Sequence, residues 1–151
     1  MSDSAAQILE EARKRADRAE VFMEQGETRS VNFENNRLKR ITAREFRGVG
    51  LRLFAGGRIG FASTTDLRDP TQLVELAVQS AQFGEKPRFD LPGPPASLPQ
   101  VPTEDSAVGK VSAEQIVAIG GEGLELSTAA SSAYLFSASI SAKTTAQRIL
   151  N

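Results

Sequence analysis

The sequence predicts an α+β fold in which a mainly antiparallel sheet packs with about three helices. Residues of alternating polarity run from Thr28 to Thr65, turn signals interrupt this run at Asn35-Asn36 and Gly56-Gly57, and amphipathic segments flank it. At 151 residues, with 40% hydrophobic and 25% charged residues, the chain is long enough for one domain with a core.

The central stretch indicates strands joined by tight turns. Val31 and Phe33 alternate with polar neighbours before Asn35-Asn36, and Leu38 to Arg44 gives a second strand. Apolar residues then fall at every second position on both sides of the turn Ala55-Gly56-Gly57: Val49, Leu51, Leu53, Ile59 and Phe61. We therefore expect Ile59 and Phe61 to continue the apolar face.

Three amphipathic helices are expected, each with a start signal. The first has the capping box Ser4–Gln7 and is followed by an extended segment, 19–24. The second has Asp69 as its N-cap and Gly84 as its stop, and the third has the capping box Ser112–Gln115. The face of the second helix predicted to be buried consists of Leu73, Leu76, Ala77, Ser80 and Ala81.

Glycines weaken the third helix. Gly120, Gly121 and Gly123 lie in its interior, where each glycine costs about 1 kcal/mol relative to alanine. We expect the helix to be broken, bent or closely packed there. The glycines do not form a dinucleotide-binding loop, because no strand precedes them and their spacing differs.

A proline-rich connection, 85–110, divides the chain. Six of the seven prolines fall between Pro87 and Pro102, which indicates an extended, polyproline-like segment. The segments after the first and third helices share a pattern, in which an alanine-led strand (from Ala133 in the second case), a short polar break and another strand follow each other. The sequence thus predicts two α-β-β-type units, 1–84 and an incomplete 111–151. The unfinished second unit indicates a fragment of a longer protein, with an open strand edge that promotes dimerisation.

The composition restricts the chemistry. The chain has no histidine and no cysteine, so it cannot supply a disulfide, a zinc site of the usual type, or a Ser-His-Asp or Cys-His arrangement. We assign no catalytic residue, metal ligand or cofactor to it. There is no secretion signal and no apolar run that could cross a bilayer, which fits a cytoplasmic protein.

Positive charge is concentrated in the middle of the chain. Residues 37–58 include one acidic residue, Glu45, and seven basic ones: Arg37, Lys39, Arg40, Arg44, Arg47, Arg52 and Arg58. One interpretation is the solvated face of a sheet, where basic residues discourage edge-to-edge pairing. The other is a patch for an acidic partner or nucleic acid. The net charge of −1 and the few interleaved aromatics disfavour nucleic acid.

Two glycines in this basic stretch define the candidate site Arg47, Gly48, Gly50 and Arg52. Gly48 and Gly50 leave one face of the strand bare, either for a bulge or close packing, or for the approach of a peptide or partner strand. In the second case, Arg47 and Arg52 would hold a carboxylate.

Two motifs carry a family resemblance: Arg47-Gly-Val-Gly-Leu-Arg52 and Gly60-Phe-Ala-Ser-Thr-Thr-Asp-Leu67, separated by a hairpin. With the Ala19-Glu-Val segment and the order of the helices, they resemble the N-terminal domain of the TldD/PmbA family, nearer to its PmbA (TldE-like) branch. The resemblance covers essentially the whole chain. It implies a cytoplasmic protein of peptide or protein proteolysis, in a metalloprotease-related family also described as modulators of DNA gyrase.

The resemblance implies a non-catalytic domain that encloses a substrate chamber or mediates subunit assembly. The implied partners are the remaining C-terminal domain, a second TldD/PmbA-type subunit, and a peptide or unfolded protein substrate. Zinc is implied only in a TldD-type subunit, on a His-Glu-x-x-x-His helix, so this chain should be inactive alone. The alternative is a stand-alone module whose basic sheet binds an acidic protein or nucleic acid. An enzyme domain that uses carboxylates alone is the third possibility, and no two acids share a recognisable arrangement.

Overall fold

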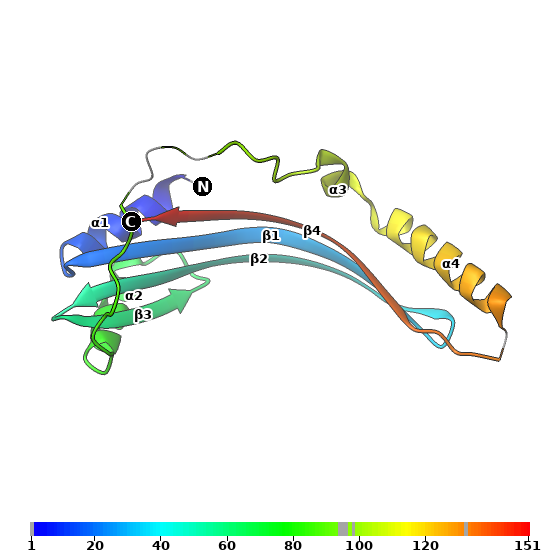
Figure 1. Ribbon diagram of the computed structural model, residues 1–151, viewed down its shortest axis with the longest axis horizontal. Helices are drawn as coiled ribbons and strands as arrows, with labels where there is room; N and C mark the ends of the chain where they lie inside the picture. Colours follow the sequence, from blue (N-terminus) through cyan, green and yellow to red (C-terminus); the bar gives the residue numbers. More distant parts are fainter. Residues whose placement is uncertain (1, 94–96, 98, 132) are drawn as a thin grey trace. The chain divides into compact units, whose positions relative to one another are not determined.

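The computed structural model describes residues 2–93, 97, 99–131 and 133–151, and these form four helices and one four-stranded sheet (Figure 1). The strand order in the sheet is β3-β2-β1-β4. The elements in chain order are α1 Ser2–Arg13, β1 Arg18–Glu34, β2 Arg37–Ala55, β3 Arg58–Thr64, α2 Pro70–Ala81, α3 Ser106–Lys110, α4 Ala113–Ala130 and β4 Ala138–Leu150. The predicted α+β class with a mainly antiparallel sheet is confirmed. No helix among the described residues is long and apolar enough to span a membrane.

The chain forms two compact units, which are described separately. Unit 1 consists of Met1–Gln25, Arg47–Gln100 and Ala146–Asn151, and unit 2 consists of Gly26–Phe46 and Val101–Thr145. The strands β1, β2 and β4 contribute residues to both units.

The core of unit 1 lies between one face of its sheet and the helices α1 and α2. Alternate residues of β1 and β2 supply the sheet side of this core, as the period of two in their polarity requires. Its buried members are Ala5, Ile8, Leu9, Ala12, Ala19, Val21, Met23, Val49, Leu51, Leu53, Leu73, Val74, Ala77 and Ala81. The small residues of α1 and α2 let both helices lie close to the strands.

The predicted apolar face of β3 is wrong. Phe61 is 57% exposed, and Gly60 and Ala62 turn toward the core instead, because they pair with Leu53 and Leu51 of β2. The two-residue turn Gly56-Gly57, with φ of +59° and +70°, sets this register. The register set by the tight turn therefore determines which face of β3 is buried, and it leaves Phe61 exposed although this residue is apolar.

Glycine at position 60 is required by the packing of α2 on β3. A Cβ atom at Gly60 would lie 2.1 Å from the carbonyl oxygen of Ala77. Glycine is required at position 84 for a similar reason, because a Cβ atom there would lie 1.8 Å from the carbonyl oxygen of Ile59. The predicted helix stop at Gly84 thus marks a close approach to β3, and α2 itself ends at Ala81.

The helix starts are only partly as predicted. The Asp69 carboxylate accepts a hydrogen bond from the Gln72 backbone N–H at 2.9 Å, which confirms the N-cap of α2. The first helix already begins at Ser2, so the predicted capping box at Ser4 is wrong. In α2, Val74 is buried and Leu76 is 49% exposed, because α2 packs onto β3 with a slightly different face.

The polar breaks predicted in the strands after the first and third helices do not exist. Residues 18–34 form one strand and residues 37–55 form another, although polar residues interrupt the alternation in both. The last strand begins at Ala138, later than the predicted start at Ala133, and also continues without a break. Pairing with neighbouring strands supplies hydrogen bonds to these polar stretches, which a local pattern cannot show.

The core of unit 2 lies where α4 packs on β1. Val31, Phe33, Ile116 and Leu124 are buried there. The Ser112 hydroxyl accepts from the Gln115 N–H at 3.2 Å and the Gln115 side chain accepts from the Ser112 N–H at 2.8 Å, which confirms the capping box.

The glycines of α4 do not break the helix. A Cβ atom at Gly120 would lie 2.1 Å from Cε2 of Phe33, so this glycine lets the helix approach the strand closely. Gly121 and Gly123 have nothing within 4 Å of that position. Of the three predicted outcomes, close packing is the one observed, and it is confined to Gly120.

The described residues of the proline-rich connection form no helix or strand up to Asp105, and residues 94–96 and 98 lie outside the described part. The last residues of the connection form the short helix α3, with Asp105 accepting from the Ala107 N–H at 2.8 Å. This helix was not predicted, because its five residues contain no apolar stripe.

We predict that the two neighbouring glycines of α4 respond oppositely to alanine. Gly120→Ala should destabilise the chain by about 1–3 kcal/mol, because the new methyl group must displace the buried Phe33 ring. Gly121→Ala should stabilise it by up to about 1 kcal/mol through helix propensity alone. Urea unfolding measures both changes, and equal effects of the two substitutions would contradict the close packing.

We also predict an acidic titration for Asp66, just after β3. Hydrogen bonds from the Arg68 side chain and backbone N–H lower the pKa of its carboxyl from 3.8 to about 2. Because this pKa is depressed on folding, its contribution to stability is present above pH 3.8 and is lost as the pH falls through about 2. Carboxyl NMR titration should show this midpoint and its rise in Arg68→Ala. A wild-type midpoint near 3.8 would contradict the ion pair.

Candidate functional site

The four residues singled out in the sequence do not share one face of β2. All four lie in unit 1, where side chains alternate between the two faces of the strand. Arg47 falls on the face of the buried Val49, whereas Gly48, Gly50 and Arg52 fall on the opposite face. The structure thus brings three of the residues together and separates Arg47 from them.

Arg52 is engaged in contacts within unit 1. Its Nη2 lies 2.6 Å from Oε1 of Glu20 on β1, and its guanidinium lies 5.3 Å from the ring centroid of Phe89. Phe89 also packs edge-to-face on Phe54, with ring centroids 5.8 Å apart. Arg52 therefore fastens the start of the proline-rich connection to the sheet, and Glu20 already neutralises its charge.

The glycines of this face form a bare strip flanked by aromatic residues. Gly48 has only the Thr64 carbonyl oxygen near its Cβ position, at 3.8 Å, and Gly50 has the Phe61 ring at 3.5 Å. Phe61 is 57% exposed, and Phe22, which shares the face of Glu20 by alternation along β1, is 38% exposed. We call Phe22, Gly48, Gly50 and Phe61 the glycine face.

Sequence reasoning missed the two aromatic members of the glycine face. The sequence contained a signal for Phe61. A two-residue turn at Gly56-Gly57 pairs Ala55 with Arg58, and this register places Phe61 opposite Arg52. Phe22 carried a similar signal, since it alternates with the buried Val21 and Met23. An aromatic ring over a strand glycine compensates for the missing side chain. Packing thus explains part of this arrangement without a ligand.

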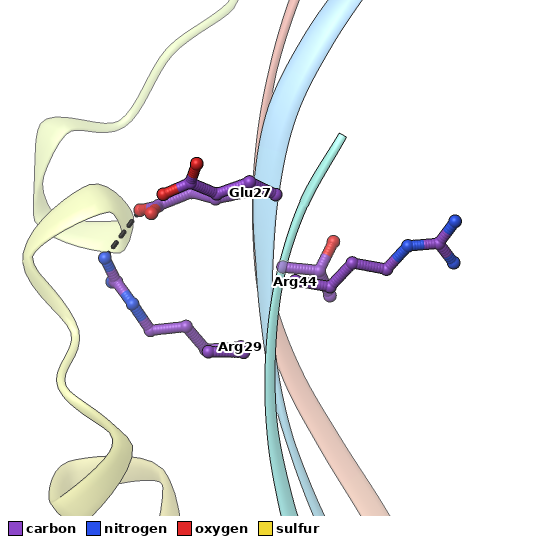
Figure 2. Close-up of a pocket in the computed structure, with 6 residues that line it drawn as sticks. Glu27, Arg29 and Arg44 are labelled. Carbon is purple, nitrogen blue, oxygen red and sulfur yellow. Dashed lines mark hydrogen bonds and ion pairs between the residues drawn. The ribbon is translucent and has the colours of Figure 1, made fainter. Parts of the chain in front are cut away.

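Unit 2 contains a separate pocket of about 330 Å³ on the strands β1 and β2. Its lining residues are Glu27, Thr28, Arg29, Ala43, Arg44 and Glu45. Figure 2 shows that Glu27 and Arg29 point toward the segment with α3, whereas Arg44 extends to the other side. The lining residues on β1 are partly buried, and those on β2 are exposed.

The two arginines of this pocket differ in their contacts. Arg29 donates to Glu27 Oε1 at 2.6 Å and to the Val111 carbonyl oxygen at 2.9 Å, so it holds the end of α3 on the sheet. Arg44 is exposed and has no ion-pair partner in the part of the chain that the structure describes. Arg44 and the exposed Glu45 are therefore the charged groups of this pocket that remain available for contacts.

The outer edge of β2 in unit 2 is open. β3 pairs only with Val49 to Ala55, so residues 37–46 have no partner strand on that side among the described residues. Every residue from Arg37 to Glu45 is exposed. We call Arg37–Phe46 the basic edge.

The described residues contain no group of three or more His, Cys, Asp or Glu side chains that could hold a metal ion. What the two surfaces offer is contact: exposed aromatic rings and bare backbone on the glycine face, and unpaired backbone with positive charge on the basic edge. Both arrangements suit the binding of a peptide or protein segment.

Residues 19–81 match the model of a known family domain, described as PmbA/TldA metallopeptidase domain 1. This match contains the motifs at residues 47–52 and 60–67, so residues 19–81 carry the first domain of this family, as those motifs indicated. No curated protein sequence matched the chain.

Solved structures share the fold. TldE from Thermococcus kodakarensis superposes with a TM-score of 0.85 at 13% sequence identity, over 97% of this chain and 34% of that chain. A Thermotoga maritima protein described as a candidate modulator of a DNA gyrase gives 0.75 at 18% identity, over 98% and 34%. A Bacteroides thetaiotaomicron protein with a similar description gives 0.68 at 16%, over 97% and 36%. These likenesses show the fold, and the chain spans about a third of each protein's length.

We predict that the glycine face tolerates side chains. Gly48→Ala and Gly50→Ala should keep or raise the free energy of unfolding, by about 0.5–1 kcal/mol at most, because each new methyl group meets only ordinary contacts. Thermal and urea unfolding measure this. A loss above 1 kcal/mol in either variant would show that close packing requires the bare backbone, whereas tolerance leaves both variants usable as probes of peptide binding.

Proposed function

We propose that this chain is the non-catalytic N-terminal domain of a cytoplasmic TldD/PmbA-family protein that takes part in the proteolysis of peptides or unfolded proteins. In this proposal the domain helps to enclose the substrate or to hold subunits together. The metal and the catalytic residues belong to another part of the protein or to a TldD-type partner subunit.

One observation carries this proposal: a chain without histidine or cysteine matches a metallopeptidase domain over residues 19–81. A domain of this kind contributes binding surface and shape to a peptidase without supplying the usual zinc ligands. The glycine face supports a contact role, because Phe22 and Phe61 are exposed beside bare backbone. The chain covers 34% of TldE, which supports further domains in the complete protein.

A second candidate function is a binding module for an acidic macromolecule. The basic edge favours it, since Arg37, Lys39, Arg40 and Arg44 lie on an exposed strand. Two proteins of the same fold are described as candidate modulators of DNA gyrase. Binding to gyrase or to DNA would make this module independent of proteolysis.

The proposal predicts that zinc and peptidase activity appear only in the assembled complex. The complete protein is co-expressed with a TldD-type subunit, and the complex is compared with the isolated chain and with a complex that lacks residues 1–151. Zinc content, mass by light scattering, and hydrolysis of unfolded casein are measured. We expect zinc and hydrolysis in the complete complex, and neither in the isolated chain.

Removal of residues 1–151 should abolish hydrolysis or release the partner subunit, while zinc stays with the TldD-type subunit. Stoichiometric zinc or casein hydrolysis by the isolated chain would overturn the non-catalytic role. An unchanged mass and an unchanged hydrolysis rate after the removal would overturn the role in enclosure and assembly.

A further inference from the structure

We infer that the basic edge, Arg37–Phe46, binds an acidic peptide segment in extended conformation by adding it as a strand to the sheet. This goes beyond the proposed function, because it assigns a ligand chemistry and a binding mode to a defined stretch of unit 2.

The open backbone of the basic edge is the first reason. The order β3-β2-β1-β4 leaves β2 with β1 on one side, and β3 reaches only from Val49 to Ala55 on the other. In a strand, alternate residues direct their N–H and C=O groups toward the same side. Half of the peptide groups along the basic edge are thus free to pair with another extended segment.

The side chains of the basic edge leave this backbone accessible. Every position from Arg37 to Glu45 is exposed. Two large apolar residues are included, Leu38 with 47% and Ile41 with 51% exposure, and they fall on opposite faces of the strand. An added strand would therefore find one apolar cross-strand contact on each face.

The positive charge of the basic edge favours an added strand with acidic side chains. The edge has four basic residues and one acidic residue, Glu45. Lys39 pairs with Glu34 at 3.1 Å, whereas Arg37, Arg40 and Arg44 have no ion-pair partner in the described parts of the chain. Acidic side chains on a neighbouring strand would pair with these arginines, and a second copy of the same edge would be repelled.

A nucleic acid fits this edge less well. Binding of single strands relies on exposed aromatic platforms, and the one aromatic residue here, Phe46, is only partly exposed. Its ring already lies 5.1 Å from the Lys143 ammonium group. A nucleic acid also offers no peptide groups to the open strand. These features favour an acidic polypeptide.

The experiment uses the complete chain and a labelled peptide of alternating glutamate and valine, long enough to pair with the whole edge. Fluorescence anisotropy gives its affinity, and amide hydrogen exchange shows where it binds. We expect binding that weakens with salt and protects amides within residues 37–46. The double variant Arg40→Glu/Arg44→Glu should bind at least about tenfold more weakly.

A matched control changes the same charge elsewhere. Lys86→Glu/Arg88→Glu alters two exposed basic residues of unit 1 and should leave the affinity unchanged. An alternating lysine and valine peptide should not bind. The glutamate peptide with an N-methyl group at every residue should lose most of its affinity, because neither of its edges then keeps the hydrogen-bond donors of a paired strand.

Equal binding of the N-methylated peptide would overturn strand addition, and this comparison needs no variant of the chain. Equal binding of the lysine peptide, or an equal loss in the control variant, would overturn the charge selection. Protection of residues 37–46 by an oligothymidylate but not by the glutamate peptide would assign the edge to nucleic acid. None of these failures affects zinc content or casein hydrolysis by the complex, so the proposed function is tested separately.

Discussion

The strand β2 has hydrogen-bonding partners on both sides over part of its length and on one side over the rest. Between Val49 and Ala55 it is a central strand, paired with β3 and buried under α1 and α2. From Arg37 to Phe46 it is an edge strand, and its side chains are exposed up to Glu45. The length of β3 sets the boundary, and the tight turn at Gly56-Gly57 sets the register of β3.

The contrast between the two parts of β2 gives their charged residues different roles. Arg52 lies on the paired part, where Glu20 and Phe89 hold it. Arg44 lies on the open part and keeps its charge available. Arg29, on the neighbouring strand, has a structural role like that of Arg52, since it fixes the end of α3. Basic residues that look equivalent in the sequence thus have two roles: some stabilise the fold through internal contacts, and others remain available to bind a partner.

Features specified by neighbouring residues could be predicted from the sequence. The turns Asn35-Asn36 and Gly56-Gly57 have the positive φ angles that asparagine and glycine favour, and the caps at Asp69 and Ser112 form as expected. The motifs at residues 47–52 and 60–67 also led to the family whose first-domain model matches residues 19–81.

Features specified by distant residues could not be predicted. Phe61 is exposed because register outweighed its apolarity, and Gly120 is needed because Phe33 of another element reaches it. The site shows the same limit. The bare glycines were visible in the sequence, but the Glu20 partner of Arg52 and the open edge beside Arg44 depend on which strands pair.

The division of β2 into a paired and an open part is tested most directly by amide hydrogen exchange of the isolated chain in dilute solution. We expect slow exchange at every amide from Leu51 to Leu53, with alternating slow and fast amides along Arg37–Phe46. Uniformly slow exchange along Arg37–Phe46 would contradict it, because that edge would then already have a partner.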